Sequence, residues 1–145
     1  MQTVAAAETI DLPEAIKKHL LQYEAQTGTQ VELVVSCSDK ILLTPYERKQ
    51  LFHIFQELLF NIRKHAGATQ VKIRLEDQND RFTLMIADNG KGFVMEENLR
   101  QKNSFGYKLL EQDIQSIGAE LNLASTPGVG TTVTVTVKKE TRQTA

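Results

Sequence analysis

The sequence predicts an α+β fold, a two-layer sandwich in which about three helices cover one face of a mixed, mostly antiparallel sheet. Two observations support this fold class. Alternating apolar residues, typical of half-buried strands, concentrate in the second half of the chain. Segments with helical apolar spacing lie before and between these strands, and each has its own start or stop signal.

Capping patterns and glycines mark the predicted helices. Asp11 with Glu14, and Thr44 with Glu47, have the three-residue spacing of a capping box. Glycines follow each helical pattern and are typical helix stops. The predicted helices, each with its capping residue or glycine stop, occupy residues 11–28, 44–67 and 107–118.

The strands are predicted from alternation and turn chemistry. Phe82, Leu84 and Ile86 alternate as one face of a half-buried strand, and residues 77–80 before them have the composition of a hairpin turn. Residues 94–103 are polar and carry charges of both signs, which predicts a mobile loop. The predicted strands lie around residues 31–35, 71–76, 81–87, 121–123 and 133–137.

Length and composition limit the possible classes. The 145 residues predict one folded domain at 10–138, with a flexible N-terminal segment at 1–9 and a flexible tail at 139–145. The balance of 17 basic and 18 acidic residues gives no global attraction to nucleic acid or to an anionic membrane. Cys37 is the only cysteine, which excludes an internal disulfide and a cysteine-based zinc site.

No stretch reaches the ~20 apolar residues of a membrane span, and no signal-peptide pattern opens the chain. We therefore expect a cytoplasmic domain that makes no membrane contact. Any membrane anchor of a longer parent protein would lie outside this sequence.

The first functional motif is Asp88-Asn89-Gly90-Lys91-Gly92, directly after a predicted strand. A strand that ends this way places a carboxylate at the edge of the core, beside backbone that can approach a ligand closely. The same residue types also make ordinary turns, so this motif alone does not assign a function.

The second motif is a polar stripe on the helix predicted at 44–67. Glu57, Asn61 and His65 follow one another at i+4 steps, and Lys64 lies between the last two in projection. Such a stripe could hold Mg²⁺ and phosphate, because magnesium takes one or two protein oxygen ligands together with substrate phosphates. It could equally be a solvated helix flank.

The motifs gain specificity from their order. The stripe from Glu57 to His65 precedes the Asp88 motif, which is followed by Gly106 and then by Gly128-Val129-Gly130-Thr131. This arrangement resembles the ATP-binding domain of the GHKL superfamily, which has the Bergerat fold and includes sensor histidine kinases, type II topoisomerases, heat-shock chaperones and mismatch-repair ATPases. Residues 56–66 are similar to the asparagine box of sensor histidine kinases of the response-regulator-pairing, short-lid type.

The resemblance implies roles for the adenine end of an ATP site. Asp88 would accept a hydrogen bond from the adenine amino group, and Gly90 and Gly92 would let the backbone pass under the base and sugar. Thr131 would reach adenine through a water molecule. The turn before it would be shaped by Gly128 and Gly130.

The resemblance also implies roles for the phosphate end. Asn61 would be the Mg²⁺ ligand, and Glu57 would act through a water molecule and assist proton removal as the catalytic residue. Lys64 and His65 would contact the phosphate and ribose side. Gly106 would open a helix whose N-terminal amides face the phosphates, a position that attracts anions in general.

One segment departs from the family pattern. The family has Gly-x-Gly followed by small residues at the exit of the lid, whereas this chain has Ser104 at the first glycine position and the larger Tyr107 and Leu109 further on. A positive φ at Ser104 would cost about 1 kcal/mol or more. The departure concerns two properties, how the lid closes and how tightly the triphosphate is bound.

The resemblance implies an ATP-dependent protein-histidine kinase domain of a two-component phosphorelay. With ATP and Mg²⁺ bound, the domain would supply the γ-phosphate to a histidine on a dimerisation hairpin, which would pass it to a response regulator. His19, His53 and His65 are the only histidines, and none lies in the phosphoacceptor context of the family. The acceptor hairpin would therefore belong to a homodimeric parent, and this domain alone would be monomeric.

Three alternatives remain open at this level. A free-standing serine kinase of the anti-sigma type shares these motifs and this length. A nucleotide-binding module without phosphotransfer would fit the altered Ser104–Leu109 segment. An unrelated structural domain would have to contain the ordered motifs by chance.

Overall fold

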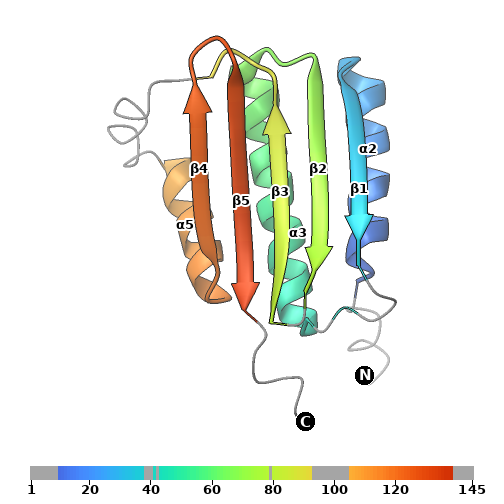
Figure 1. Cartoon of the computed structure of the whole chain (residues 1–145), viewed down its shortest axis with the longest axis vertical. Helices are drawn as coiled ribbons and strands as arrows, with labels where there is room; N and C mark the ends of the chain where they lie inside the picture. The colour runs from blue at the N-terminus through green and yellow to red at the C-terminus, as the bar shows by residue number, and fades with distance from the viewer. Residues whose placement is uncertain (1–9, 38–40, 42, 79, 93–104, 139–145) are drawn as a thin grey trace.

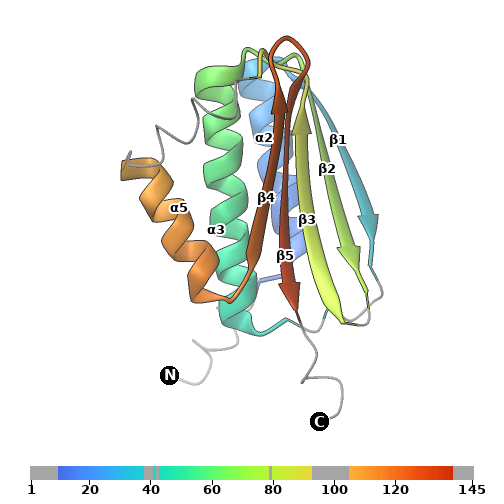
Figure 2. The same ribbon diagram turned by 60° about the vertical axis from the view of Figure 1, so that its left-hand side comes forward.

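The computed structural model describes residues 10–37, 41, 43–78, 80–92 and 105–138. In this part of the chain, helices cover one face of a single sheet, as Figures 1 and 2 show. The helical elements are α2 (Leu12–Thr27), α3 (Pro45–Asn61), the π-helix η1 (Ile62–Ala66) and α5 (Phe105–Ser116). The strands are β1 (Gln30–Ser36), β2 (Gln70–Asp77), β3 (Arg81–Asp88), β4 (Glu120–Thr126) and β5 (Gly130–Lys138).

The helix starts follow from the predicted caps. The Asp11 carboxylate accepts a hydrogen bond from the Glu14 amide at 3.2 Å, ahead of α2. At the start of α3, the Glu47 amide donates to the Thr44 hydroxyl at 3.1 Å, and the Thr44 amide donates to the Glu47 carboxylate at 3.0 Å. The second capping box is therefore complete and fixes the start of the helix that carries the polar stripe.

The sheet has five strands in the order β1-β2-β3-β5-β4. The pair β1–β2 is parallel, and the other three pairs are antiparallel. Strand β5 lies between β3 and β4, so the strand that begins at Gly130 runs directly beside the strand that ends at Asp88. The predicted fold class, a mixed and mostly antiparallel sheet under a helical layer, is confirmed.

The core lies between the helical layer and the inward face of the sheet. Alternate residues of β2, β3 and β5 point into it, and α2, α3 and α5 cover it with their apolar stripes. The largest side chains within it with under 2% exposure include Phe55, Leu51, Ile54, Phe82, Leu84 and Ile86.

Helix α3 ends differently from the sequence prediction. The stripe spacing predicts a continuous α-helix to Gly67, but the α-helical part ends at Asn61 and η1 continues the chain to Ala66. Gly67 then closes the segment with φ +63°. In a π-helix the hydrogen bonds span five residues, so His65 does not lie one further α-helical step beyond Asn61. Single π-helical turns occur frequently at functional sites.

Several predicted site elements meet at one end of the fold. Figure 1 shows the end of α3 with η1, the end of β3 and the β4–β5 turn gathered at the upper end of the molecule. The first residues of α5 are the end of that helix nearest to them. None of the described helices combines the length and apolarity that crossing a membrane requires.

Candidate functional site

Three polar side chains form a row at one end of the otherwise apolar inner face of the sheet. Asp88 is the register partner of Thr131 across β3 and β5, and Thr131 is the partner of Ser125 across β5 and β4. The period of two in each strand places all three on the face that carries Ile86, Val133 and Leu123. The row therefore adjoins the core and faces the helical layer.

Asp88 is held by backbone amides. The Gly90 amide donates to Asp88 Oδ1 at 2.7 Å. Burial raises the pKa of Asp88, while hydrogen bonding to the backbone of Gly90 and Thr131 opposes the rise. Because an ionised carboxylate can accept about four hydrogen bonds, Asp88 keeps capacity for a donor on a ligand.

The glycines beside this row make a close backbone approach possible. Gly92 has φ +64°, and a Cβ there would overlap the Thr126 carbonyl. Gly130 has φ +139°, and a Cβ there would overlap the carbonyl of Asp88. The Gly128 amide also donates to the Lys91 carbonyl at 2.7 Å, which joins the loop after β3 to the β4–β5 turn. A side chain at Gly92 or Gly130 would therefore push these two segments apart.

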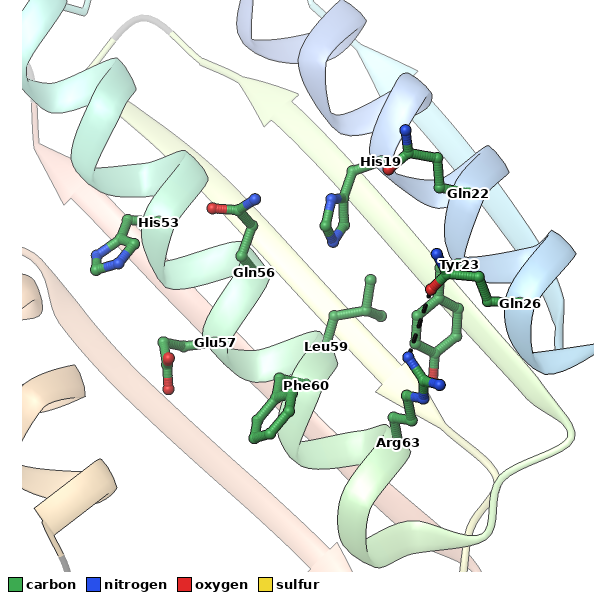
Figure 3. Close-up of a pocket in the computed structure, with 10 residues that line it drawn as sticks. All are labelled: His19, Gln22, Tyr23, Gln26, His53, Gln56, Glu57, Leu59, Phe60 and Arg63. Carbon is green, nitrogen blue, oxygen red and sulfur yellow. Dashed lines mark hydrogen bonds between the residues drawn. The ribbon is translucent and has the colours of Figure 1, made fainter.

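The polar stripe of α3 faces α5. His53 Nδ1 lies 2.8 Å from Asp113 Oδ2 on α5, which identifies this side of the helix. Figure 3 shows Glu57 pointing to the same side as His53, and Asn61 follows one α-helical turn later. Glu57 is half-buried and Asn61 is exposed. The structure thus places Glu57 and Asn61 along the edge of α3 that borders α5.

The remaining predicted residues have the following positions. Lys64 lies in η1, exposed, with its Nζ 6.0 Å from the centre of the Phe60 ring. His65 also lies in η1, and Gly106 is the second residue of α5. The side chain of His65, the loop predicted at 94–103 and the departure at Ser104 lie outside the described residues.

The described residues contain no group of three or more His, Cys, Asp or Glu side chains that could hold a metal ion. A cation bound mainly by phosphate oxygens needs only one or two protein oxygens. The amide oxygen of Asn61 and the carboxylate of Glu57 fit that donor chemistry.

A groove of about 330 Å³ opens elsewhere, between α2 and α3 (Figure 3). His19, Tyr23 and Gln26 form its α2 side, and Phe60 of α3 and Arg63 of η1 lie on the opposite side. Of the residues predicted for the site, Glu57 alone lines this groove, and its carboxylate points toward α5. The groove is therefore distinct from the row of Asp88, Thr131 and Ser125.

Sequence reasoning missed Ser125. Its hydroxyl lies 2.8 Å from the Thr131 hydroxyl and donates to the Gly130 carbonyl at 3.3 Å. The alternation Leu121, Leu123, Ser125 could have placed it on the inner face. Its contact with Thr131 depends on the β4–β5 register, which the alternation does not give.

Comparison with known proteins supports the predicted resemblance. Residues 46–141 match the family model described as histidine kinase-, DNA gyrase B-, and HSP90-like ATPase. The signal transduction histidine-protein kinase/phosphatase DegS of Brevibacillus brevis is 30% identical over 139 residues, which cover 95% of this chain and 35% of DegS. The sensor protein VraS of Staphylococcus haemolyticus is 40% identical over 85 residues, 59% of this chain and 24% of VraS. This chain thus spans about a third or less of these two relatives.

Solved structures show the same fold. The histidine kinase domain of the Erythrobacter litoralis EL346 blue-light activated histidine kinase matches with a TM-score of 0.75 at 20% identity, covering 93% of this chain and 68% of that one. The mycobacterial sensor histidine kinase MprB matches with a TM-score of 0.70 at 18% identity, covering 89% and 96%. The chain therefore belongs to the family of histidine kinase-, DNA gyrase B- and HSP90-like ATPases, as an ATPase domain of the kind that sensor histidine kinases carry.

Proposed function

We propose that this chain is the MgATP-binding catalytic domain of a two-component sensor histidine kinase. The observation that carries the proposal is the register that sets Asp88 beside Thr131 at the end of the inner sheet face. The helical layer over this face includes α3, which carries Glu57 and ends at Asn61. An amide-anchored carboxylate beside tight glycine turns fits a flat ligand with a hydrogen-bond donor. The adjoining helix edge fits its phosphates and their cation.

Asp88 would read the adenine base. The Gly90 amide fixes its carboxylate at 2.7 Å, so its remaining lone pairs have a set direction. A base with an amino group along that direction donates to Asp88, and a base with a carbonyl there does not. Thr131, held against Ser125 at 2.8 Å, would orient a water molecule between the strand and the base.

Asn61 and Glu57 would serve the phosphate end. The amide oxygen of Asn61 would be a direct Mg²⁺ ligand, and the carboxylate of Glu57 would hold a water of the same ion. Lys64 and His65 would contact phosphate and ribose, and the start of α5 near Gly106 would contribute helix N-terminal amides. Bound MgATP would supply the transferable γ-phosphoryl group.

The residues of this chain would act mainly by positioning and by neutralising charge, as phosphoryl transfer requires. Glu57 would additionally assist removal of a proton from the acceptor nucleophile. The nucleophile would be a histidine on the dimerisation hairpin of the parent kinase, and a response regulator would receive the phosphoryl group afterwards.

The relatives favour this function over a serine kinase of the anti-sigma type. Those named above are histidine kinases or sensor proteins, and DegS aligns over nearly the whole of this chain. From the family resemblance, we further propose that the parent is a homodimeric sensor whose kinase domain lies in the cytoplasm.

Nucleotide binding is tested by thermal unfolding of the full 145-residue chain with and without MgADP. A ligand selective for the native state adds about 2.7 kcal/mol at a concentration 100 times its Kd. The melting temperature should rise with MgADP, and Asp88→Asn should abolish the rise. Asp80→Asn, which replaces an exposed acid just before the start of the same strand, is the matched control and should retain it. An unchanged rise in Asp88→Asn would remove Asp88 from the site.

Phosphotransfer is tested separately with γ-labelled ATP. The chain is mixed in trans with the dimerisation hairpin of DegS from Brevibacillus brevis, and with an anti-sigma antagonist protein that carries an acceptor serine. Acid-labile label on the hairpin, lost when its histidine is replaced, is the expected result. Acid-stable label on the serine protein alone would assign the chain to the other class of kinase.

A further inference from the structure

We propose that Asn89 is a positioning residue that aligns Asp88 for reading the base and ties it to the end of the helix that carries Asn61. This inference rests on the proposed function, because it takes Asp88 as the group that recognises adenine. It concerns the residue between Asp88 and Gly90, whose side chain is hydrogen-bonded at the start of β2.

Asn89 uses both ends of its side-chain amide. Its Oδ1 accepts hydrogen bonds from the amides of Thr69 and Gln70, both at 3.0 Å. Its Nδ2 donates to the Thr69 hydroxyl, also at 3.0 Å. The backbone amide of Asn89 donates to the Gln70 carbonyl at 3.2 Å. Four hydrogen bonds therefore join one residue of the loop after β3 to Thr69, just before β2, and to Gln70, the first residue of β2.

These bonds continue the β2–β3 pair beyond its last register partners. The ladder ends where Val71 faces Asp88, and the Asn89 side chain then holds the two strand ends together. On the other side of Asp88, the Gly90 amide contacts its carboxylate at 2.7 Å. Asn89 thus fixes the backbone next to Asp88, and the Gly90 amide fixes its carboxylate.

The partners of Asn89 lie close to the phosphate end of the site along the chain. Thr69 follows Gly67, the residue that closes η1, and η1 follows Asn61 directly. The Thr69 carbonyl also accepts from the Gln30 amide at 3.0 Å, which fixes this segment to the start of β1. A short, hydrogen-bonded segment therefore connects the residue next to Asp88 with the helix end that carries Asn61 and Lys64.

A positioning role predicts a loss of base selectivity, which is different from a loss of stability. A less stable protein binds every nucleotide more weakly by the same factor, because only the folded fraction binds. A misaligned Asp88 weakens binding of ADP, whose base has an amino group, but not of IDP, whose base has a carbonyl at that position. The ratio of the two affinities therefore isolates the alignment of Asp88.

The experiment measures the Kd of MgADP and of MgIDP by titration calorimetry on the full chain. The variants are Asn89→Ala, Thr69→Val and Asp88→Asn. Thr69→Val removes only the hydroxyl that accepts from Asn89 Nδ2 and keeps both backbone amides, so it serves if Asn89→Ala does not fold. Asn122→Ala, an exposed asparagine on β4, is the matched control.

We expect the wild-type chain to prefer MgADP and Asp88→Asn to lose this preference. Asn89→Ala should reduce the preference roughly 3- to 10-fold, as expected when one hydrogen bond is misaligned. Thr69→Val should reduce it by a smaller factor, and Asn122→Ala should leave it unchanged. If Asp88→Asn loses the preference while Asn89→Ala and Thr69→Val keep it, the positioning role is wrong and the proposed function stands. If the wild-type chain shows no preference, or Asp88→Asn retains it, the assigned role of Asp88 fails, and the role of Asn89 fails with it.

Discussion

Asp88, the last residue of β3, lies directly opposite Thr131, the second residue of β5. The inner faces of these strands are apolar up to this pair, where they become polar. A carboxylate at such a boundary is desolvated by burial, and its pKa rises as a result. Its position costs stability, as is common where a binding group is held ready for a ligand.

Replacing Asp88 should therefore stabilise the protein without ligand. Asp88→Asn keeps an oxygen that can accept from the Gly90 amide and removes the desolvated charge, so the free energy of unfolding at pH 7 should increase. Because the folded-state pKa is raised, the folded chain binds the proton more readily. The stability of the wild-type chain thus falls as pH rises from the ordinary Asp pKa to the raised value.

Urea unfolding of both proteins at several pH values checks this prediction. The advantage of Asp88→Asn should be present above that interval and vanish below it, where Asp88 is protonated in both states. An advantage that is independent of pH, or a destabilised variant at pH 7, would contradict the assignment of burial as the cause.

Gly92 should tolerate alanine much less well than Gly118 does. Their φ angles, +64° and +62°, are almost equal, so both variants pay a similar left-handed backbone penalty of about 1 kcal/mol. A Cβ at Gly118 meets open space, but at Gly92 it overlaps the Thr126 carbonyl. Gly92→Ala should therefore lose clearly more unfolding free energy than Gly118→Ala, and it should also weaken MgADP binding. Equal losses of unfolding free energy in urea would show that the loop after β3 shifts to accommodate the added Cβ without a further loss of stability.

Most of the elements were predictable from local patterns. The Thr44–Glu47 capping box and the alternation of Phe82, Leu84 and Ile86 each involve residues close together in sequence, and both are present as predicted. The fold class followed from the same patterns, because they gave the types and order of the elements. The placement of Asp88 at the end of a half-buried strand was also local information.

Other features depend on contacts between distant segments. The insertion of β5 between β3 and β4 pairs Asp88 with Thr131, and no local pattern contains that register. Ser125 joins the site only through the same pairing. The change from α3 to η1 after Asn61 has no apolar-spacing signal, and for this reason the predicted i+4 step from Asn61 to His65 does not describe the structure.

Asn61 should determine how nucleotide binding depends on magnesium. It is exposed at the end of α3, so Asn61→Ala removes no core contact, and unfolding in the absence of nucleotide should change little. The Kd of ADP measured with Mg²⁺ and with a chelator should differ in the wild-type chain and become nearly equal in the variant. Asn122→Ala, also exposed, should behave as the wild type. Persistent magnesium dependence in Asn61→Ala would argue against a ligand role.

The contact of His53 with Asp113 should be a measurable link between α3 and α5. The ring nitrogen and carboxylate lie 2.8 Å apart, and the side-chain exposures are 58% for His53 and 19% for Asp113. Exposed pairs contribute about 0.2 to 1 kcal/mol, and the more buried Asp113 also accepts from Gln50 at 3.3 Å. Asp113→Ala should therefore destabilise the protein more than His53→Ala does.

A double-mutant cycle in urea gives the coupling energy between His53 and Asp113. It should exceed the coupling of Arg74 with Glu76, an exposed pair on one strand whose atoms lie 3.4 Å apart. The difference is expected because the His53 pair joins two separate elements and its carboxylate is better shielded from solvent. Since α5 carries Gly106 at its start, weaker attachment of α5 should also reduce the affinity for ATP more than for adenosine, which has no phosphates. A coupling energy near zero, with unchanged affinities for ATP and adenosine, would show that this contact contributes neither to stability nor to nucleotide binding.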